Sequence, residues 1–171
     1  MRTLLAGRAP GLARVITVVA TSDLEWVLIS DQELDVTAVT AWASRDSCGA
    51  LVLFCGTVRS SSSTGEDIIA LEYDTSVELA EPRIAEVIAA ARTRWPAIEA
   101  VAVHHRIGRV ELGGVTVVVA VSSPHRGEAF AAGQYCIDTV KASVPMWKKE
   151  LWDGGSIWSQ EATTIAPVTD S

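Results

Sequence analysis

The sequence lacks the motifs by which many enzymes are recognised. No P-loop, dinucleotide fingerprint, nucleophile elbow or zinc motif is present. Its three cysteines, Cys48, Cys55 and Cys136, are scattered, with no CxxC pair and no histidine at metal-ligand spacing. We interpret them as buried thiols in a reducing cytosol. We therefore expect no metal and no resident cofactor, so any reactivity must come from a partner or from the substrate itself.

Positive charge is also scarce. The chain has 14 Lys and Arg against 21 Asp and Glu, which gives a net charge of −7. This acidic balance argues against binding to nucleic acid or to an anionic membrane, because both need an excess of basic side chains on the surface. An anionic ligand would have to be held in a local cationic pocket.

The length of the chain predicts a single domain. A chain of 171 residues can bury one good core but is too short for two ordinary domains. We expect that domain over 23–162, followed by a flexible tail over 163–171. Residues 1–22 contain three Arg and no acid, and we expect a loose extension or a start site placed too far upstream. Their apolar run, Val15–Ala20, is too short to cross a membrane.

Hydrophobic periodicity predicts an α+β fold, because strand and helix patterns occur without βαβ regularity. Strands are expected at Glu25–Ser30, Gly49–Val58, Ile68–Tyr73, Ile98–His105, Gly114–Ser122 and Trp152–Gln160. Helices are expected at Asp35–Ala43, Ser76–Trp95 and Glu128–Ala142. The segment Arg109–Gly114 is predicted to be a hairpin connection, and Ser60–Glu66 a mobile loop.

Lysine is confined to one short stretch. Lys141, Lys148 and Lys149 are the only lysines, and they fall within nine residues, whereas every other basic residue is Arg. Arg stays protonated in proteins, so an amine is needed where a group must give or take a proton. The distribution therefore suggests amine chemistry near the end of the predicted helix Glu128–Ala142. Chance and a biased codon pool are the alternative explanation for so few residues.

Three further basic groups lie at strand ends. His125 and Arg126 precede the same helix, and free N–H groups at a helix start favour an anion. Arg59 ends an apolar strand, which is also what an ordinary capped strand end looks like. The cluster His104-His105-Arg106 has no carboxylate or thiolate nearby in sequence, and we interpret it as a strand-end feature, not a metal site.

Five sequence blocks, in this order and spacing, resemble the molybdopterin synthase large subunit family. The blocks are Gly56-Thr-Val-Arg59, His105-Arg-Ile-Gly108, Ser123-Pro-His-Arg126, Ala131-Ala-Gly-Gln134 and Lys141-Ala-Ser-Val-Pro-Met-Trp-Lys-Lys-Glu150. The likeness runs from about Glu25 to Glu161, and the last block is highly specific. Ser60–Thr64 departs from the family pattern, which often has a polar stretch with Asn and His there.

The resemblance implies a fold, a partner and a reaction. The fold would be of the α/β-hammerhead type, a mixed or antiparallel sheet packed with two long helices. The large subunit would form a dimer, and each copy would bind one small ubiquitin-like sulfur carrier, giving a heterotetramer. The carrier's Gly-Gly end, as a thiocarboxylate, would deliver sulfur to cyclic pyranopterin monophosphate in molybdenum cofactor biosynthesis. No protein cysteine would then be needed.

The resemblance also implies roles for individual residues. Lys141 matches the family's essential lysine, and Lys148 its second active-site lysine. The positions that bind the pterin phosphate and the carrier tail are matched by Arg59, His125 and Arg126. Those that line the same pocket are matched by Thr57, Val58, Lys149 and Glu150. This assignment requires all of these side chains to converge on one pocket.

Two other functions fit the same cationic residues. A phosphate-ester hydrolase or cyclase would be active without a carrier protein. A scaffold that only binds a ubiquitin-like partner would tolerate replacement of Lys141 and Lys148. Both alternatives stay open at the level of the sequence.

Overall fold

Two β-sheets and three helices make up the described part of the computed structural model, which covers residues 18–62, 65–159 and 166–168. The helices are α1 (Val36–Ala43), α2 (Val77–Arg94) and α3 (Arg126–Ser143). The strands are β1 (Val18–Ser22), β2 (Glu25–Ser30), β3 (Ala50–Thr57), β4 (Ile68–Asp74), β5 (Val101–Arg106), β6 (Gly108–Glu111), β7 (Val115–Ser123), β8 (Trp147–Trp152) and β9 (Gly155–Trp158).

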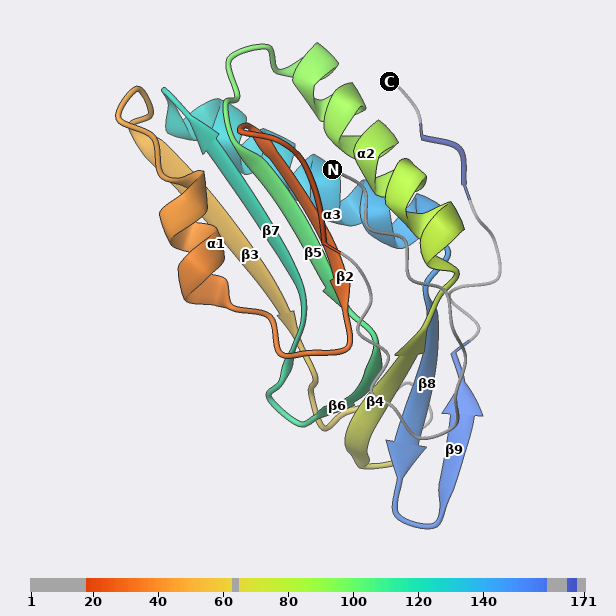
Figure 1. Ribbon diagram of the computed structural model, residues 1–171. Helices are drawn as coiled ribbons and strands as arrows, with labels where there is room; N and C mark the ends of the chain where they lie inside the picture. The colour runs from red at the N-terminus through yellow and green to blue at the C-terminus, as the bar shows by residue number, and fades with distance from the viewer. Residues whose placement is uncertain (1–17, 63–64, 160–165, 169–171) are drawn as a thin grey trace.

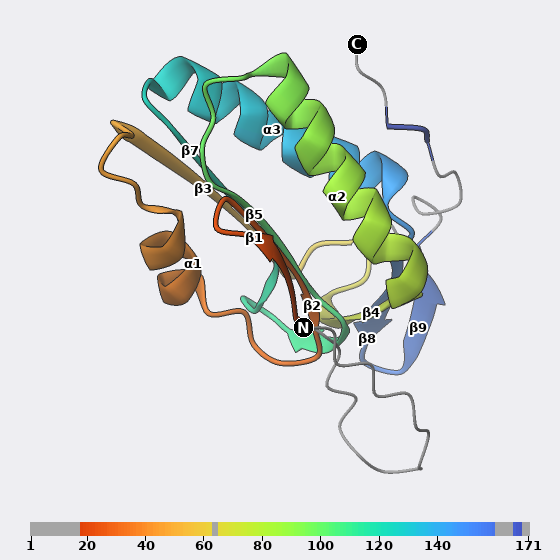
Figure 2. The ribbon, with the colours of Figure 1, turned by 45° about the horizontal axis from the view of Figure 1, so that its top comes forward.

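The larger sheet has five strands in the order β1-β2-β5-β7-β3. Only the β2–β5 pair is parallel, so the sheet is mixed. The two long helices α2 and α3 lie on one face, and the short α1 lies on the other (Figures 1 and 2). Because β7 is covered on both faces, its sequence is a nearly continuous apolar run, and almost every residue in it is buried.

The main core lies between the five-stranded sheet and the two long helices. Ile84, Val87 and Ile88 of α2 pack with Val101 and Val103 of β5 in this core. A second core fills the space between the opposite sheet face and α1. Alternation along β5 therefore sends neighbouring side chains to different cores, which later matters for its two histidines.

The smaller sheet is antiparallel, with the strand order β6-β4-β8-β9. The chain passes from the first sheet to the second between β5 and β6, where Gly108 has φ of +75°. An L-residue with a side chain rarely adopts this angle, so glycine is needed at the bend. In Figure 1 the second sheet lies beyond the ends of β2 and β5, below α2 and α3.

One arginine fastens the end of α2 to the edge of the first sheet. The Arg92 guanidinium donates to the Glu25 carboxylate at 2.7 Å and to the backbone oxygens of Leu24 at 2.7 Å and Glu99 at 2.5 Å. Its side chain is 24% exposed. The bonds join α2, the start of β2 and the loop before β5, and so hold the helix in place over the sheet.

The predicted α+β class and the three predicted helices are confirmed, as are five of the six predicted strands, with ends shifted by a few residues. The prediction for Arg109–Gly114 was wrong in part, because Gly108–Glu111 is strand β6, paired with β4. The single last strand expected at Trp152–Gln160 is instead the second half of a hairpin, β8–β9.

The structure also bears on the two ends of the expected domain. Strand β1 falls within the segment that was assigned to the extension, and it pairs with β2. Residues 1–17 lie outside the described residues. Within the expected tail, the Ala166 N–H donates to the Ala142 carbonyl at 2.9 Å, and Val168 packs against the main core. Within the described ranges, no helix is long and apolar enough to cross a membrane.

Candidate active site

A cavity of about 550 Å³ lies where the end of α3 meets the second sheet. It is bounded by the C-terminal ends of β3 and β5, the beginning of β7, the last turns of α3 and one face of β4 and β8. Its volume is in the range of small-molecule sites. The polar side chains important for its chemistry are Thr57, Arg59, His105, Lys141, Lys148 and Glu150.

The floor of the cavity is a row of three residues across the first sheet. His105 pairs with Val117, and Val117 pairs with Gly56. A Cβ on Gly56 would lie 2.6 Å from Cγ1 of Val117, so only glycine fits here without a shift. Immediately after Gly56 the β3–β7 register shifts, which turns the chain out of the sheet towards Thr57 and Arg59.

Lys141 lines the cavity from the last turn of α3 and is exposed to solvent. Ile137, Val140 and Val144 follow the same helical face and also line the cavity. A cation is favourable at this position because the C-terminal end of a helix carries partial negative charge. The helix ends at Ser143, and Pro145 then begins the link to β8, as the sequence predicted.

Lys148 and Glu150 form the facing wall. Two residues apart on β8, they lie on the same face of the strand, opposite Tyr73 and Leu71 of β4. The Lys148 Nζ lies 3.6 Å from Glu150 Oε1. The Glu150 side chain is 11% exposed, so this carboxylate offsets part of the positive charge that Arg59, Lys141 and Lys148 bring.

A buried hydroxyl holds the turn between the two lysines. The Thr75 hydroxyl, at the junction of β4 and α2, donates to the Pro145 carbonyl at 2.6 Å. Thr75 is 4% exposed, so water does not compete for this bond. The bond fixes the turn between Lys141 and Lys148 against the second sheet.

Cys55 also lines the cavity. Burial raises the pKa of its thiol, which keeps the sulfur protonated and makes it a poor nucleophile. The buried Cys136 thiol lies outside the cavity, and burial raises its pKa to about 12. Neither thiol is suited to act as the source of a reactive sulfur.

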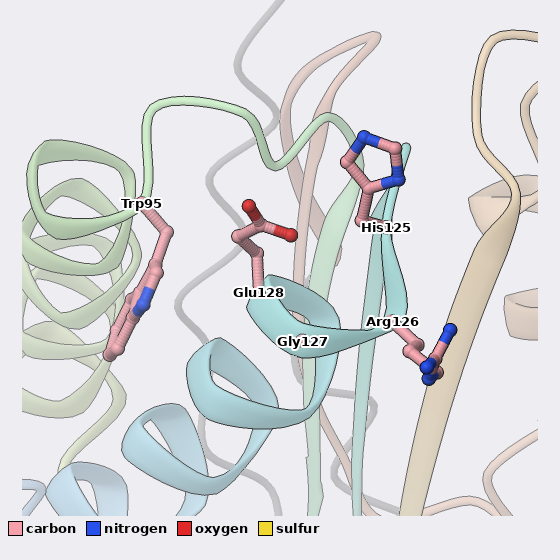
Figure 3. A pocket seen from close by; sticks show the side chains of 5 residues that line it. All are labelled: Trp95, His125, Arg126, Gly127 and Glu128. Atoms are coloured by element: carbon pink, nitrogen blue, oxygen red, sulfur yellow. The ribbon is translucent and has the colours of Figure 1, made fainter.

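The structure differs from the expectation of a single pocket. His125 and Arg126 lie at the start of α3, in a separate open hollow of about 520 Å³ that they share with Trp95, Gly127 and Glu128. Figure 3 shows Arg126 pointing away from Trp95, towards β3. At about 1.5 Å per residue, Arg126 and Lys141 are roughly 22 Å apart along the helix. Within one chain these groups cannot bind the same phosphate.

Two of the residues expected in the pocket also face elsewhere. Val58 is buried in the small core of the second sheet with Ile68 and Val110. Lys149 lies on the other face of β8, where its Nζ is 5.6 Å from the centre of the Trp158 ring. Strand alternation explains the second case, because Lys148 and Glu150 take the cavity side.

The sequence analysis did not assign His105 to the pocket. Its ring packs edge-on against Tyr73, with centroids 5.0 Å apart, and both residues line the cavity. The signal available was its place at the end of a strand, beside the family block that it begins. Among the described residues no group of three His, Cys, Asp or Glu is placed to hold a metal ion.

Comparison with known proteins shows that the chain matches one family model and is similar to proteins of known name or structure. Residues 29–143 match the family model described as MoaE protein. The molybdopterin synthase catalytic subunit of Nostoc is 42% identical over 126 residues, which cover 73% of this chain and 76% of that protein. The molybdopterin synthase structure from Staphylococcus aureus has a TM-score of 0.72 and 32% identity, covering 81% of this chain and 98% of that one.

A more distant structure shares the fold. It is a complex of subunits 1 and 2 of molybdopterin-converting factor from Helicobacter pylori, with a TM-score of 0.66 and 21% identity. The match covers 81% of this chain and 92% of that one.

Proposed function

Because the chain belongs to the MoaE family, we propose that it is the catalytic subunit of a molybdopterin synthase. In this role it transfers sulfur from the thiocarboxylated C-terminus of a small ubiquitin-like carrier to cyclic pyranopterin monophosphate. The observation that carries the proposal is the meeting of Arg59, Lys141 and Lys148 in one cavity of about 550 Å³. A pocket of this size and charge suits a phosphate-bearing ring together with an extended peptide end.

The cavity residues have distinct roles in this reaction. The carrier's sulfur forms a carbon–sulfur bond at a side-chain carbon of the pterin as a carbon–oxygen bond at that carbon breaks. Water then hydrolyses the resulting thioester at its acyl carbon, which leaves the sulfur on the pterin and releases the carrier as a carboxylate. We assign to Lys141 the transfer of a proton as the sulfur adds. Arg59 and Lys148 neutralise the phosphate as its cyclic ester opens. Glu150 keeps Lys148 in place. Two deliveries complete the dithiolene.

The partner follows from the same proposal. A protein of the same fold forms a complex with a second subunit in Helicobacter pylori, which supports a small carrier subunit here. Burial raises the pKa of the Cys55 thiol in the cavity, which suits a sulfur that arrives from outside the chain. Three free thiols in the described residues suit a reducing compartment, and we place the enzyme in the cytoplasm.

The proposal includes a dimer of the large subunit, which would make the whole enzyme a heterotetramer. The separation of the two ends of α3 supports it. His125 and Arg126 are exposed and too far from Lys141 of their own chain to share a ligand with it. In a twofold dimer the start of α3 from one copy can reach the cavity of the other. We propose that these two residues complete the phosphate site of the second copy.

The direct test mixes the purified chain with thiocarboxylated carrier and cyclic pyranopterin monophosphate. Lys141→Arg keeps the charge but removes an amine that can give up a proton, so sulfur transfer should fall by on the order of 10² or more while carrier binding persists. Product formation is measured by chromatography, and carrier binding by calorimetry. Product without carrier would favour the hydrolase, and normal turnover by the variant would favour the scaffold.

A further inference from the structure

The two adjacent histidines of β5 have different surroundings. His104 faces the core under α1, where its ring packs edge-on against Trp26 with centroids 4.4 Å apart. Both of its ring nitrogens are buried without a hydrogen-bond partner in the described part of the chain. His105 faces the opposite side and lines the cavity. Only His105 is therefore placed to meet a ligand.

The hydrogen bonding of His105 fixes its tautomer. Its Nδ1 lies 2.8 Å from the carbonyl oxygen of Arg106. A carbonyl can only accept, so Nδ1 carries the proton. Burial lowers the pKa of His105 to about 4, against a smaller opposite effect of this hydrogen bond. Near neutral pH the ring is therefore uncharged, and Nε2 keeps its lone pair.

A neutral acceptor is unusual in this cavity. The charged groups that line it are Arg59, Lys141, Lys148 and Glu150, and Tyr73 packs against the His105 ring. Three cations disfavour a further positive charge on the imidazole. A phosphate or a thiocarboxylate offers only acceptors, which Nε2 would repel. The ligand group that faces His105 must be a hydrogen-bond donor.

We propose that His105 Nε2 accepts a hydrogen bond from a ring N–H of the pterin and so orients the ring in the cavity. This inference rests on the proposed function. The pyrimidine ring of the pterin is planar and carries N–H donors, and the row His105–Val117–Gly56 gives it a largely apolar floor. The phosphate then lies towards the cations. His105 acts as a binding and orienting group and does not transfer a proton.

The first experiment measures binding of cyclic pyranopterin monophosphate to the full chain by calorimetry. His105→Phe keeps the ring and its contact with Tyr73 but removes the acceptor, and should raise the Kd for the pterin roughly 10-fold. His105→Gln places an amide oxygen near the position of Nε2 and should recover most of that affinity. The Kd for a carrier with an unmodified Gly-Gly end should stay at the wild-type value in both variants.

A second measurement uses the unaltered chain, so it does not depend on how the variants fold. In ¹⁵N-labelled protein the Nε2 signal of His105 should move in the direction of hydrogen bonding when the pterin is added, and should not move with carrier alone.

The matched control for the calorimetric experiment is His104→Phe. This variant should leave the Kd for the pterin and the Kd for the carrier unchanged, because His104 faces the other core.

Each remaining outcome contradicts a different claim. If His105→Phe binds the pterin with wild-type affinity, and the Nε2 signal of the unaltered chain does not move when pterin is added, the role of His105 is overturned and the proposed function stays intact. Weakened carrier binding with unchanged pterin binding also overturns it, and makes a peptide N–H of the carrier tail the donor. If the wild-type chain binds no pterin, in the presence or absence of carrier, the proposed function itself fails.

Discussion

The two ends of α3 carry the same kind of charge in very different settings. At the C-terminal end, Lys141 is itself exposed but lines a cavity formed by two sheets and the helix, which the Lys148–Glu150 pair also lines. At the N-terminal end, His125 and Arg126 lie exposed in an open hollow (Figure 3). A chain can build the first site alone. The second would need another surface before Arg126 is desolvated, and in our proposal the second copy of the chain supplies that surface.

The largest expected effect tests whether the two ends of α3 act together in a site shared by two copies of the chain. Lys141→Ala and Arg126→Ala should each lower sulfur transfer by on the order of 10², because the first removes the amine that transfers the proton and the second removes a cation from the phosphate site. In a heterodimer of the two variants, one cavity has Lys141 from its own chain and Arg126 from the other. Co-expression with two tags isolates this heterodimer, and its activity should return to roughly half of wild type.

The matched control puts both substitutions in one chain. A heterodimer of this double variant with wild type has Lys141 and Arg126 together in neither cavity if the site is shared between copies. Its activity should stay low. If instead it retains half activity while the two single variants fail to complement, each chain uses its own Arg126. The separation along α3 would then be closed by a rearrangement within the chain.

The second effect is the pH dependence of stability that the two buried histidines of β5 produce. Burial lowers the pKa of both His104 and His105 from 6.5 to about 4. Between these values the unfolded chain binds more protons than the folded one, so stability is complete above about pH 6.5 and falls as pH drops towards 4. From pH 7.5 to 5, each histidine should lower the free energy of unfolding by about 2 kcal/mol.

Urea unfolding at the two pH values measures this loss. His104→Phe and His105→Phe should each remove about half of the histidine contribution. After correction for the intrinsic exchange rate, hydrogen exchange should show that the protection of the β5 amides falls as the pH drops. If the free energy of unfolding changed equally with pH in wild type and in the two β5 variants, the assigned burial of the histidines would be wrong.

The elements of the fold were predictable where one pattern dominates. The apolar run of β7 and the periodicity of α2 and α3 gave the right class and nearly the right ends. The strands β6 and β8 were missed because charged residues make up half of each strand and neither shows a clear apolar alternation. In β6 only Val110 faces a core, and in β8 Lys148 and Glu150 face a polar cavity. No local pattern distinguishes such strands from a turn.

The site was predictable in part. The confinement of lysine to one stretch led to Lys141 and Lys148, which do line one cavity with Arg59. The predicted helix already separated Arg126 from Lys141 by 15 residues, roughly 22 Å at about 1.5 Å per residue, so the sequence could have excluded a pocket shared by both within one chain. His105 could not be assigned to the pocket in this way. Only the packing of the two sheets decides which of two adjacent histidines meets the cavity.

The smallest expected effects come from one glycine at each end of the comparison. A Cβ at Gly56 would meet Val117 Cγ1 at 2.6 Å in the cavity floor, and the stiff valine cannot yield, so Gly56→Ala should cost about 1–3 kcal/mol. A Cβ at Gly127, in the first turn of α3, would meet nothing within 4 Å. Because alanine restricts the unfolded chain, Gly127→Ala should stabilise the chain by about 0.4–1 kcal/mol.

Urea unfolding of the two variants at pH 7.5 measures both changes: the free energy of unfolding should fall in Gly56→Ala and rise in Gly127→Ala. Activity gives a further result, because Gly127 lies in the hollow that a second copy is proposed to cover. If that surface approaches the helix start closely, Gly127→Ala should lower sulfur transfer although it raises stability. Unchanged activity in a more stable Gly127→Ala chain would mean that the hollow keeps room for a methyl group in the dimer. A destabilised Gly127→Ala chain would contradict the open position of that residue.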